Sequence, residues 1–103
     1  MKFNPVLFAK AISDETRQKI MNICCCTSIS VNEIVEKLDV SQPTVSHHLA
    51  ILREADLVTV REEGKQTFYS LNQENIAICC GQLMIKFAPE STTTEKMQMI
   101  LKA

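Results

Sequence analysis

The sequence lacks an apolar run long enough to span a membrane, and its start lacks the basic and then apolar segments of a signal peptide. We therefore expect a cytoplasmic protein without a membrane partner. It also lacks an excess of one charge, because 11 Lys and Arg residues against 12 Asp and Glu residues give a formal net charge of −1 at pH 7. A polycation that binds nucleic acid regardless of sequence is therefore not expected. A sequence-specific binder with basic residues gathered on one face is compatible with this balance.

No repeat, low-complexity stretch or linker divides the chain, whose 103 residues suit one modest domain. Apolar residues make up 46% of the sequence, which is enough for one core. We therefore expect a single domain over residues 1–103. A domain of this size gains stability by burying surface against a second copy.

The five cysteines include no Cys-x-x-Cys pair, the commonest spacing of zinc knuckles and thioredoxin-type sites. No oxyanion loop and no base placed beside a cysteine is recognisable either. An odd number of cysteines in a reducing compartment argues against a disulfide framework. We therefore expect no catalytic residue and no enzyme.

Two helices joined by a short turn are predicted between residues 31 and 52. The first covers Val31–Leu38, and Asp39-Val40 forms the turn. Ser41 is a typical N-cap for the second helix, and Pro43 suits its first turn. The apolar residues of this second helix recur at helical spacing: Val45, Leu49 and Leu52. The pattern predicts a helix-turn-helix.

The second helix has a polar face that suits the edges of bases in a major groove. Its hydrogen-bonding side chains gather near the helix N-terminus: Ser41, Gln42, Thr44, Ser46 and His47. We predict that these residues contact DNA. The alternative is an ordinary helical hairpin whose outer face is solvated.

A β-hairpin is predicted directly after this helix. Leu57–Arg61 and Gln66–Leu71 are rich in β-branched and aromatic residues, and a Gly-containing turn at residues 62–65 separates them. A hairpin in this position is a wing, from which Arg61 and Lys65 reach phosphates or the minor groove. Lys37 and Arg53 could add positive charge. The expected fold is mainly α with a β-hairpin wing, a winged helix-turn-helix.

The helix-turn-helix and the wing, residues 31–71, together form the expected reading head. Four further helices are expected outside it. They cover Lys2–Ile12, Glu15 to about Cys25, Gln73–Phe87 after an Asn72 cap, and a last helix capped by Thr92, Thr93 or Thr94. Each of these helices has an apolar stripe. The stripe of the first comprises Phe3, Val6, Leu7, Ala9 and Ala11, and that of the second comprises Ile20, Ile23 and Cys24. The stripe of the third comprises Ile76, Cys79, Cys80, Leu83, Met84 and Phe87, and that of the last comprises Met97, Ile100 and Leu101.

The outer helices need a surface to bury against, and a twofold homodimer is the economical answer. Helices at about 2–12 and 73–87 would then form the interface, and two reading heads would meet half-sites about one helical turn apart. The alternative is that these stripes close a monomeric core.

The cysteines form a second notable pattern, with three in a row at Cys24–Cys26 and a pair at Cys79-Cys80. Clustered thiolates suit soft, thiophilic ions and electrophiles. Cys24 falls on an apolar stripe and is expected in the core. Neighbours on a helix point about 100° apart, so Cys79 and Cys80 cannot both face one point unless the backbone bends. We predict a thiolate metal site drawn from Cys25, Cys26, Cys79 and Cys80; the alternative is that each cysteine only packs.

Several motifs together resemble the ArsR/SmtB family of winged-helix repressors. The segment Ile12-Ser13-Asp14-Glu15-Thr16-Arg17 resembles the family's Leu-Ser-Asp-x-Thr-Arg entry to its second helix. Residues 41–49 resemble its recognition helix almost residue for residue, and residues 57–58 and 64–71 resemble its wing. The resemblance covers residues 8 to about 87. It implies that Arg61 and Lys65 contact the DNA backbone and that the first and fifth helices form the dimer interface. It also implies that bases and phosphates are contacted by Ser41, Gln42, Thr44, Ser46 and His47.

The effector site departs from the family's best-known patterns. Ser30-Val31-Asn32 stands where arsenic and cadmium sensors often have Cys-Val-Cys. The fifth helix, over residues 75–87, has neither the His nor the carboxylates of the zinc sensors. Other members have relocated cysteine sites, or redox pairs that link the second and fifth helices. The resemblance therefore suggests a relocated thiol site.

The leading hypothesis is a repressor of a metalloid-resistance operon that needs no cofactor for DNA binding. Trivalent arsenic or antimony, held by two or three thiolates, would release it from operator DNA. One alternative keeps the DNA binding and makes the cysteines a redox or persulfide switch. An alternative of another class is a winged-helix protein-interaction module with inert cysteines.

Overall fold

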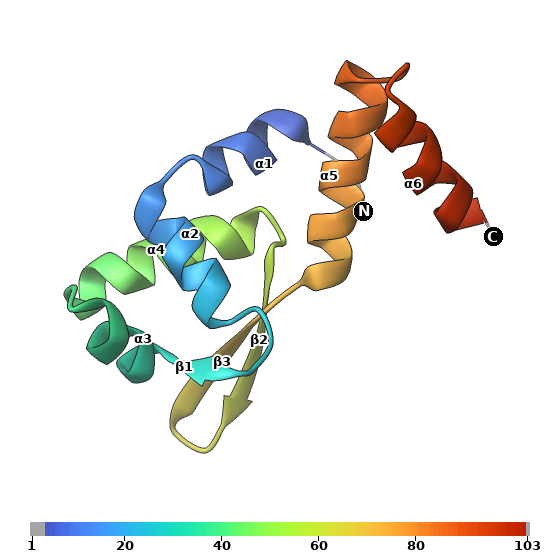
Figure 1. Ribbon diagram of the computed structural model, residues 1–103. Helices are drawn as coiled ribbons and strands as arrows, with labels where there is room; N and C mark the ends of the chain where they lie inside the picture. Colours follow the sequence, from blue (N-terminus) through green and yellow to red (C-terminus); the bar gives the residue numbers. More distant parts are fainter. Residues whose placement is uncertain (1–3, 103) are drawn as a thin grey trace.

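The structure is a computed structural model that describes residues 4–102, with the side chains of residues 101 and 102 outside the description. Within this range the elements are α1 (Pro5–Ile12), α2 (Glu15–Ile23), β1 (Ile29–Ser30), α3 (Val31–Leu38), α4 (Gln42–Glu54), β2 (Val58–Glu63), β3 (Gln66–Leu71), α5 (Gln73–Phe87) and α6 (Thr92–Lys102). The helices α1 to α4 gather above a small sheet, whereas α5 and α6 stand to one side (Figure 1). Among the described residues, none of the helices combines the length and apolar character needed to cross a membrane.

Local signals fix the two helices of the helix-turn-helix. The Ser30 hydroxyl accepts a hydrogen bond from the Glu33 amide, and the Glu33 carboxylate reaches back to Ser30 in a capping box. Asp39 ends α3 in the left-handed region, at φ 53°. The Ser41 hydroxyl accepts from the Thr44 amide at 3.3 Å and so caps α4. The predicted helix over Val31–Leu38 and the predicted cap of the next helix are confirmed.

The wing is part of a three-stranded antiparallel sheet with the order β1-β3-β2. Glu62 pairs with Thr67 and Glu63 with Gln66, so the turn comprises only two residues and not the four predicted. Gly64 supplies the positive φ of 63° that this tight turn needs. The strand β1 was not predicted, because two residues carry no recognisable alternation.

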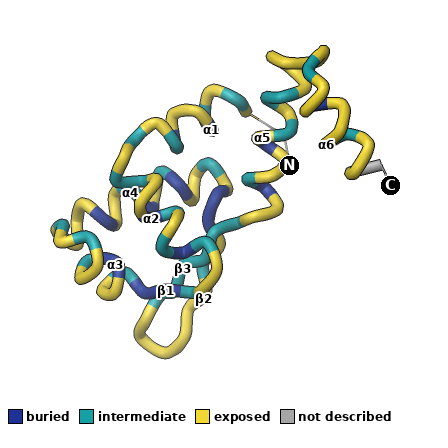
Figure 2. The backbone as a smooth tube through the Cα atoms, in the orientation of Figure 1, coloured by how far each residue is buried: buried dark blue, intermediate teal, exposed yellow. Residues whose placement is uncertain are grey.

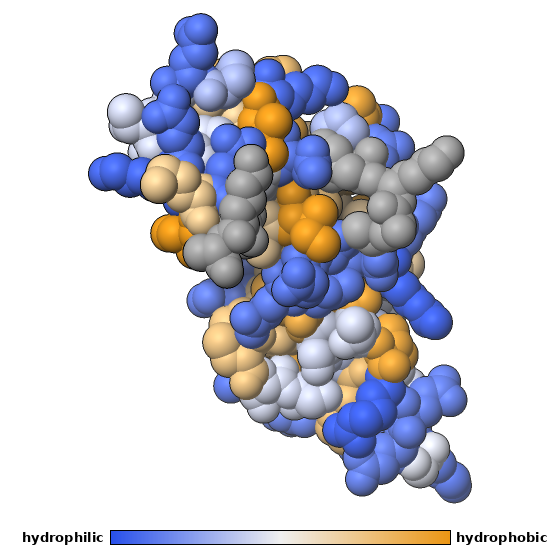
Figure 3. Space-filling view, turned by 90° about the vertical axis from the view of Figure 1, so that its right-hand side faces the viewer, coloured by the Kyte–Doolittle hydropathy of each residue, from blue (hydrophilic) through white to orange (hydrophobic). Residues whose placement is uncertain are grey.

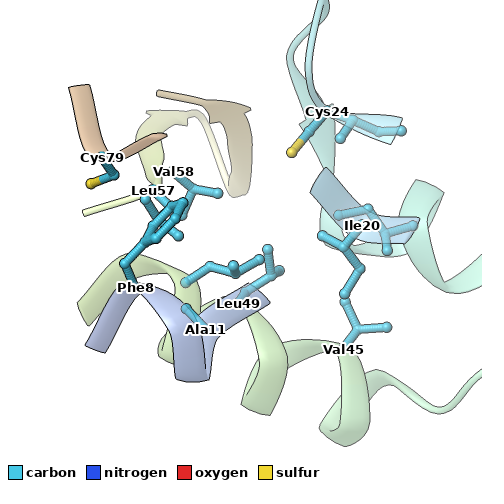
Figure 4. Close-up of a cluster of buried hydrophobic side chains, with 12 residues drawn as sticks. Phe8, Ala11, Ile20, Cys24, Val45, Leu49, Leu57, Val58 and Cys79 are labelled. Carbon is cyan, nitrogen blue, oxygen red and sulfur yellow. The ribbon is translucent and has the colours of Figure 1, made fainter. Parts of the chain in front are cut away.

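A single core joins the helices to the sheet. Its largest fully buried side chains include Ile20, Ile34, Leu49, Leu52 and Leu57. Figure 2 shows that buried residues concentrate where the elements meet, whereas the wing turn and most of α6 are exposed. Figure 4 shows Cys24 and Cys79 at different ends of this cluster, so these two thiols serve the core separately.

The prediction for the apolar face of α1 was correct for Ala11 and wrong for Val6 and Ala9. Phe8 and Ala11 are buried, whereas Val6 is 62% exposed and Ala9 is exposed. The reason is that the helix begins at Pro5, after the Asn4 cap, and packs through residues three apart. Phe3, which was also predicted on this face, lies outside the described residues.

The ends of the outer helices differ in part from the prediction. The helix α2 ends at Ile23, two residues early, and Cys24 is its C-cap. The helix α5 spans the predicted residues, but Phe87 is 73% exposed because the last turn extends past the rest of the body (Figure 1). The helix α6 begins after Ser91, whose hydroxyl accepts from the Thr93 amide, and not after a threonine cap.

Candidate nucleic-acid interface and thiol site

The helix α4 has one fully buried face and one exposed face. Val45, Leu49 and Leu52 are at most 1% exposed. The predicted DNA contacts on this helix and at its cap are all exposed: Ser41, Gln42, Thr44, Ser46 and His47. Burial of the apolar stripe thus holds the polar residues outward, where a major groove can be reached.

The exposed residues of α4 are not equivalent. The Ser41 hydroxyl caps the helix and lies 2.8 Å from the Thr44 hydroxyl, so these two side chains are partly engaged. Among residues 4–102, the side chains of Gln42 and Ser46 make no hydrogen bond. They can therefore turn toward a base edge without losing an internal contact.

The basic residues of the wing have different surroundings. The Arg61 guanidinium forms an ion pair with Glu63 and lies 5.0 Å from the centre of the Phe68 ring. Lys65 is exposed in the turn and lines a polar hollow of about 170 Å³ together with Asn32 and Gln42. Lys65 is therefore next to the start of α4, whereas Arg61 must leave an acidic partner to contact a phosphate.

A network that the sequence did not indicate ties α4 to α1 and α2. Arg17 donates to the carbonyl oxygens of Ala11 at 2.7 Å and of Lys10 at 3.0 Å. Its Nη1 lies 3.0 Å from Nδ1 of His48. Because a guanidinium only donates, Nδ1 of His48 must accept, and that ring is neutral. The motif around Arg17 was noted in the sequence, but nothing in it named His48 as the partner.

Acid should weaken the fold through His48. Burial lowers the pKa of His48 below its ordinary 6.5; the charges of Arg17 and His47 lower it further, and Asp14 opposes them. The neutral form is thus favoured in the folded protein, so this stabilisation is present above pH 6.5 and is lost as the pH falls through the lowered pKa. We expect the melting temperature to fall more between about pH 8 and about pH 5 in the wild type than in His48→Gln, whose amide oxygen still accepts from Arg17. Equal losses, measured by differential scanning fluorimetry, would contradict this role.

The thiols at the end of α2 differ sharply in exposure. Cys24 is fully buried, and burial raises its pKa to about 11. Cys26 is exposed and Cys25 is half-buried, with their sulfur atoms 2.6 Å apart. The hydrogen bond between the two thiols raises the pKa of Cys25, and partial burial adds to the effect. The expectation that Cys24 belongs to the core is confirmed.

The two cysteines of α5 point in different directions. Cys79 is buried and donates a long hydrogen bond to Asn75, and burial raises its pKa. Cys80 is exposed. It lines an apolar groove of about 330 Å³, between α1, α2 and α5, whose wall also includes Cys25. The structure therefore brings Cys25 to Cys26, and Cys25 and Cys80 to one groove, while Cys79 faces the core.

No compact metal cluster is preformed in the part of the chain that the structure describes, because no three Cys, His, Asp or Glu side chains gather there at ligand spacing. The end of α2 is nevertheless joined to the next elements. The Leu71 amide donates to the Cys24 carbonyl at 2.8 Å, and the Gln73 side chain donates to the Cys25 carbonyl at 2.5 Å. A displacement of residues 24–26 would therefore also move the end of β3 and the start of α5.

Comparison with known proteins assigns this architecture. The family described as "Bacterial regulatory protein, arsR family" matches residues 14–60, which hold α2, the helix-turn-helix and the start of the wing. The transcriptional repressor SdpR of Bacillus subtilis is 40% identical over 63 residues, or 61% of this chain and 70% of SdpR. An arsenical resistance operon repressor of Staphylococcus xylosus is 37% identical over 65 residues, or 63% of this chain and 62% of that repressor.

A solved structure extends the likeness beyond the reading head. Reduced HlyU from Vibrio cholerae is 31% identical, with a TM-score of 0.66 over 81% of this chain and 87% of HlyU. The predicted winged helix-turn-helix and the predicted family are confirmed. The chain belongs to the ArsR family of bacterial regulatory proteins.

Proposed function

We propose that this protein is a dimeric transcriptional repressor in the cytoplasm, which leaves its operator DNA when trivalent arsenic or antimony binds thiolates at the end of α2. The observation that carries the proposal is the position of the Cys25 and Cys26 thiols, 2.6 Å apart and bonded through the Cys25 carbonyl to the start of α5. The arsenical resistance repressor of Staphylococcus xylosus supports the choice of inducer.

The DNA contact follows from the exposed face of α4. Gln42, Ser46 and His47 would contact base edges, and Ser41 and Thr44 would contact bases or phosphates near the helix start. Lys65 would contact a phosphate from beside Gln42, and Arg61 would do so after exchanging Glu63 for DNA. The formal net charge of −1 would keep nonspecific affinity low.

The dimer follows from apolar side chains left on the surface. The large hydrophobic residues found exposed among the described residues all lie on α1, α5 and α6: Val6, Ile78, Ile85, Phe87, Met97, Met99 and Ile100. Figure 3 shows apolar patches among polar atoms on the face that carries α5 and α6. A second copy packed against α1 and α5 would cover part of this surface and set two α4 helices at the spacing of two half-sites.

The inducer would act by moving the end of α2. A trivalent ion would take Cys25 and Cys26, and Cys80 could supply a third thiolate across the groove that it shares with Cys25. Cys79 could join only if α5 turned, because its thiol faces the core. Strain at residues 24–26 would pass through the bonds to Leu71 and Gln73 into β3 and α5. A coupling of about 1–3 kcal/mol is enough to switch a promoter.

The same groove favours a second candidate function. A persulfide donor could transfer its outer sulfur atom to the Cys25 thiol. Attack of the Cys80 thiol on the Cys25 sulfur would then form a disulfide, release hydrogen sulfide and link α2 to α5 without any metal ion. Hydrogen peroxide would form the same disulfide and be reduced to water. Dithiothreitol would restore DNA binding after such a change. Tris(2-carboxyethyl)phosphine, a reductant without thiols, would restore it as well. Of these two reagents, only the dithiol would remove a bound metalloid.

The DNA-binding part of the proposal predicts a large loss in the double variant Ser46→Ala/His47→Ala. We expect operator affinity to fall about 30-fold or more, because two base contacts that contribute about 1–3 kcal/mol each are lost. The melting temperature should change little, because both side chains are exposed. Fluorescence anisotropy with the promoter upstream of the protein's own gene measures the affinity.

The matched control is Ala50→Ser, an exposed site later in the same helix, which should leave affinity within about twofold. Unchanged affinity in the double variant would remove these residues from the reading face.

A further inference from the structure

Another cavity lies between α5 and α6, apart from the DNA-binding face. It has a volume of about 220 Å³. Its lining is largely apolar and includes Ala77, Gly81, Met84 and Met97. A Cβ atom built on Gly81 would meet nothing within 4 Å, so the space beside that residue is open.

One polar group in this cavity is unsatisfied. Thr94 lines the cavity and is only 2% exposed. Its hydroxyl oxygen has no hydrogen-bond partner among the described residues. Buried hydroxyl groups in proteins are nearly always hydrogen-bonded, so an exception indicates a site at which a ligand atom can complete the bond.

One nucleophile also lines the cavity, on α5, whereas Thr94 belongs to α6. Cys80 is exposed and is the single cysteine among the residues that line this cavity. A thiol is a soft nucleophile that reacts with soft electrophiles. An apolar space with one unpartnered hydroxyl and one thiol therefore suits a small apolar molecule that has both a carbonyl oxygen and an electrophilic carbon.

We propose that the cavity between α5 and α6 binds small α,β-unsaturated ketones, which accept a hydrogen bond from Thr94 and are attacked by Cys80. This proposal does not rest on the metalloid site. Both sites would use the Cys80 thiol, so an adduct there would leave the metalloid only Cys25 and Cys26. The ligand class suits the cavity because the apolar ring or chain contacts alanine, glycine and methionine, while its single oxygen meets the single unpaired hydroxyl.

The reaction is a conjugate addition without any redox partner. The Cys80 sulfur forms a bond to the β-carbon, and the π electrons of the carbon–carbon double bond move to give an enolate. The Thr94 hydroxyl donates to the enolate oxygen as negative charge develops there. The proton released by the thiol reaches the α-carbon through solvent, so the product is a thioether with a saturated ketone.

The experiment measures the adduct itself. The full chain is incubated with 2-cyclohexen-1-one, and intact-mass and peptide mass spectrometry give the rate of addition at each cysteine. We expect addition at Cys80 to be faster than at Cys26 and to be slowed by excess cyclohexanone, which has the oxygen but not the double bond. Thr94→Val should slow addition at Cys80 by at least about tenfold, because one donor to the developing charge is lost. Gly81→Leu, which fills the space, should slow it at least as much.

Two controls separate recognition from general access. Iodoacetamide alkylates a thiol by displacement of iodide, so no enolate forms and Thr94 has no developing charge to stabilise. It should therefore alkylate Cys80 in Thr94→Val within about twofold of the wild-type rate. Gln82→Leu, an exposed neighbour outside the cavity lining, should leave the addition of cyclohexenone unchanged. Equal addition rates in the wild type and Thr94→Val would overturn the proposal. So would an equal slowing of iodoacetamide and cyclohexenone, since the substitution would then have acted on thiol access alone.

Discussion

Replacement of both Cys25 and Cys26 with serine is expected to abolish the release of operator DNA by arsenite. Wild-type protein should lose affinity about 5- to 150-fold when the metalloid binds, as a coupling of about 1–3 kcal/mol implies. The double variant should show no loss, because the oxygen of serine is a poor ligand for a soft ion. Its affinity without arsenite should equal that of the wild type, since neither residue lies on α4 or the wing. Fluorescence anisotropy with and without arsenite measures both quantities.

Cys24→Ser is the matched control for this result. Cys24 is fully buried in the core, so a polar hydroxyl there should lower the free energy of unfolding by about 1–3 kcal/mol. Release by arsenite should nevertheless survive, because Cys25 and Cys26 are intact. If the double variant still released DNA while Cys24→Ser did not, the metalloid site would have to be centred on the core thiol.

Arg17→Met is expected to destabilise the fold by about 2–4 kcal/mol, the largest effect that we expect on stability. The substitution keeps an unbranched apolar chain in place of the aliphatic part of Arg17 but removes the donors to the Ala11 and Lys10 carbonyls and to His48. Two carbonyl groups at the end of α1 would then lose a charged donor, and α4 would lose its link to α2. Urea unfolding followed by circular dichroism gives the difference in free energy.

Lys19→Met provides the comparison on the same helix. Lys19 forms an ion pair with Glu15 at 3.6 Å, and both side chains are more than half exposed. Such pairs contribute little, so we expect a loss of less than about 0.5 kcal/mol. Equal losses in Arg17→Met and Lys19→Met would show that the network around His48 does not stabilise the fold.

The reading head could be predicted from the sequence because its signals are local. Ser41 and Pro43 mark the start of α4, and the spacing of Val45, Leu49 and Leu52 marks its buried face. Each of these signals acts within about one turn of helix, and the tertiary packing agrees with it. Once the buried face of α4 was known, the remaining polar residues of that helix were expected on its exposed face.

The rest of the site depends on contacts between distant residues, for which one sequence has no signal. Arg17 and His48 are 31 residues apart, and Gln73 and Cys25 are 48 apart. The pattern of Cys79 and Cys80 showed that they point apart, but not that Cys80 shares a groove with Cys25. The wing was predicted with too long a turn, because Glu62 and Glu63 look like turn residues until their pairing with β3 is known.

The most direct test of the central claim is a titration of the wild-type protein on its own promoter, followed by fluorescence anisotropy. Arsenite, cadmium, zinc and a persulfide donor would each be added to the preformed complex. We predict release by arsenite at concentrations that leave the complex intact with zinc, and recovery when an excess of a chelating dithiol is added. Release by the persulfide donor alone, reversed by dithiothreitol, would contradict the metalloid site and establish the redox switch. A complex that none of these reagents disturbs would show that the thiols of α2 and α5 have no part in regulation.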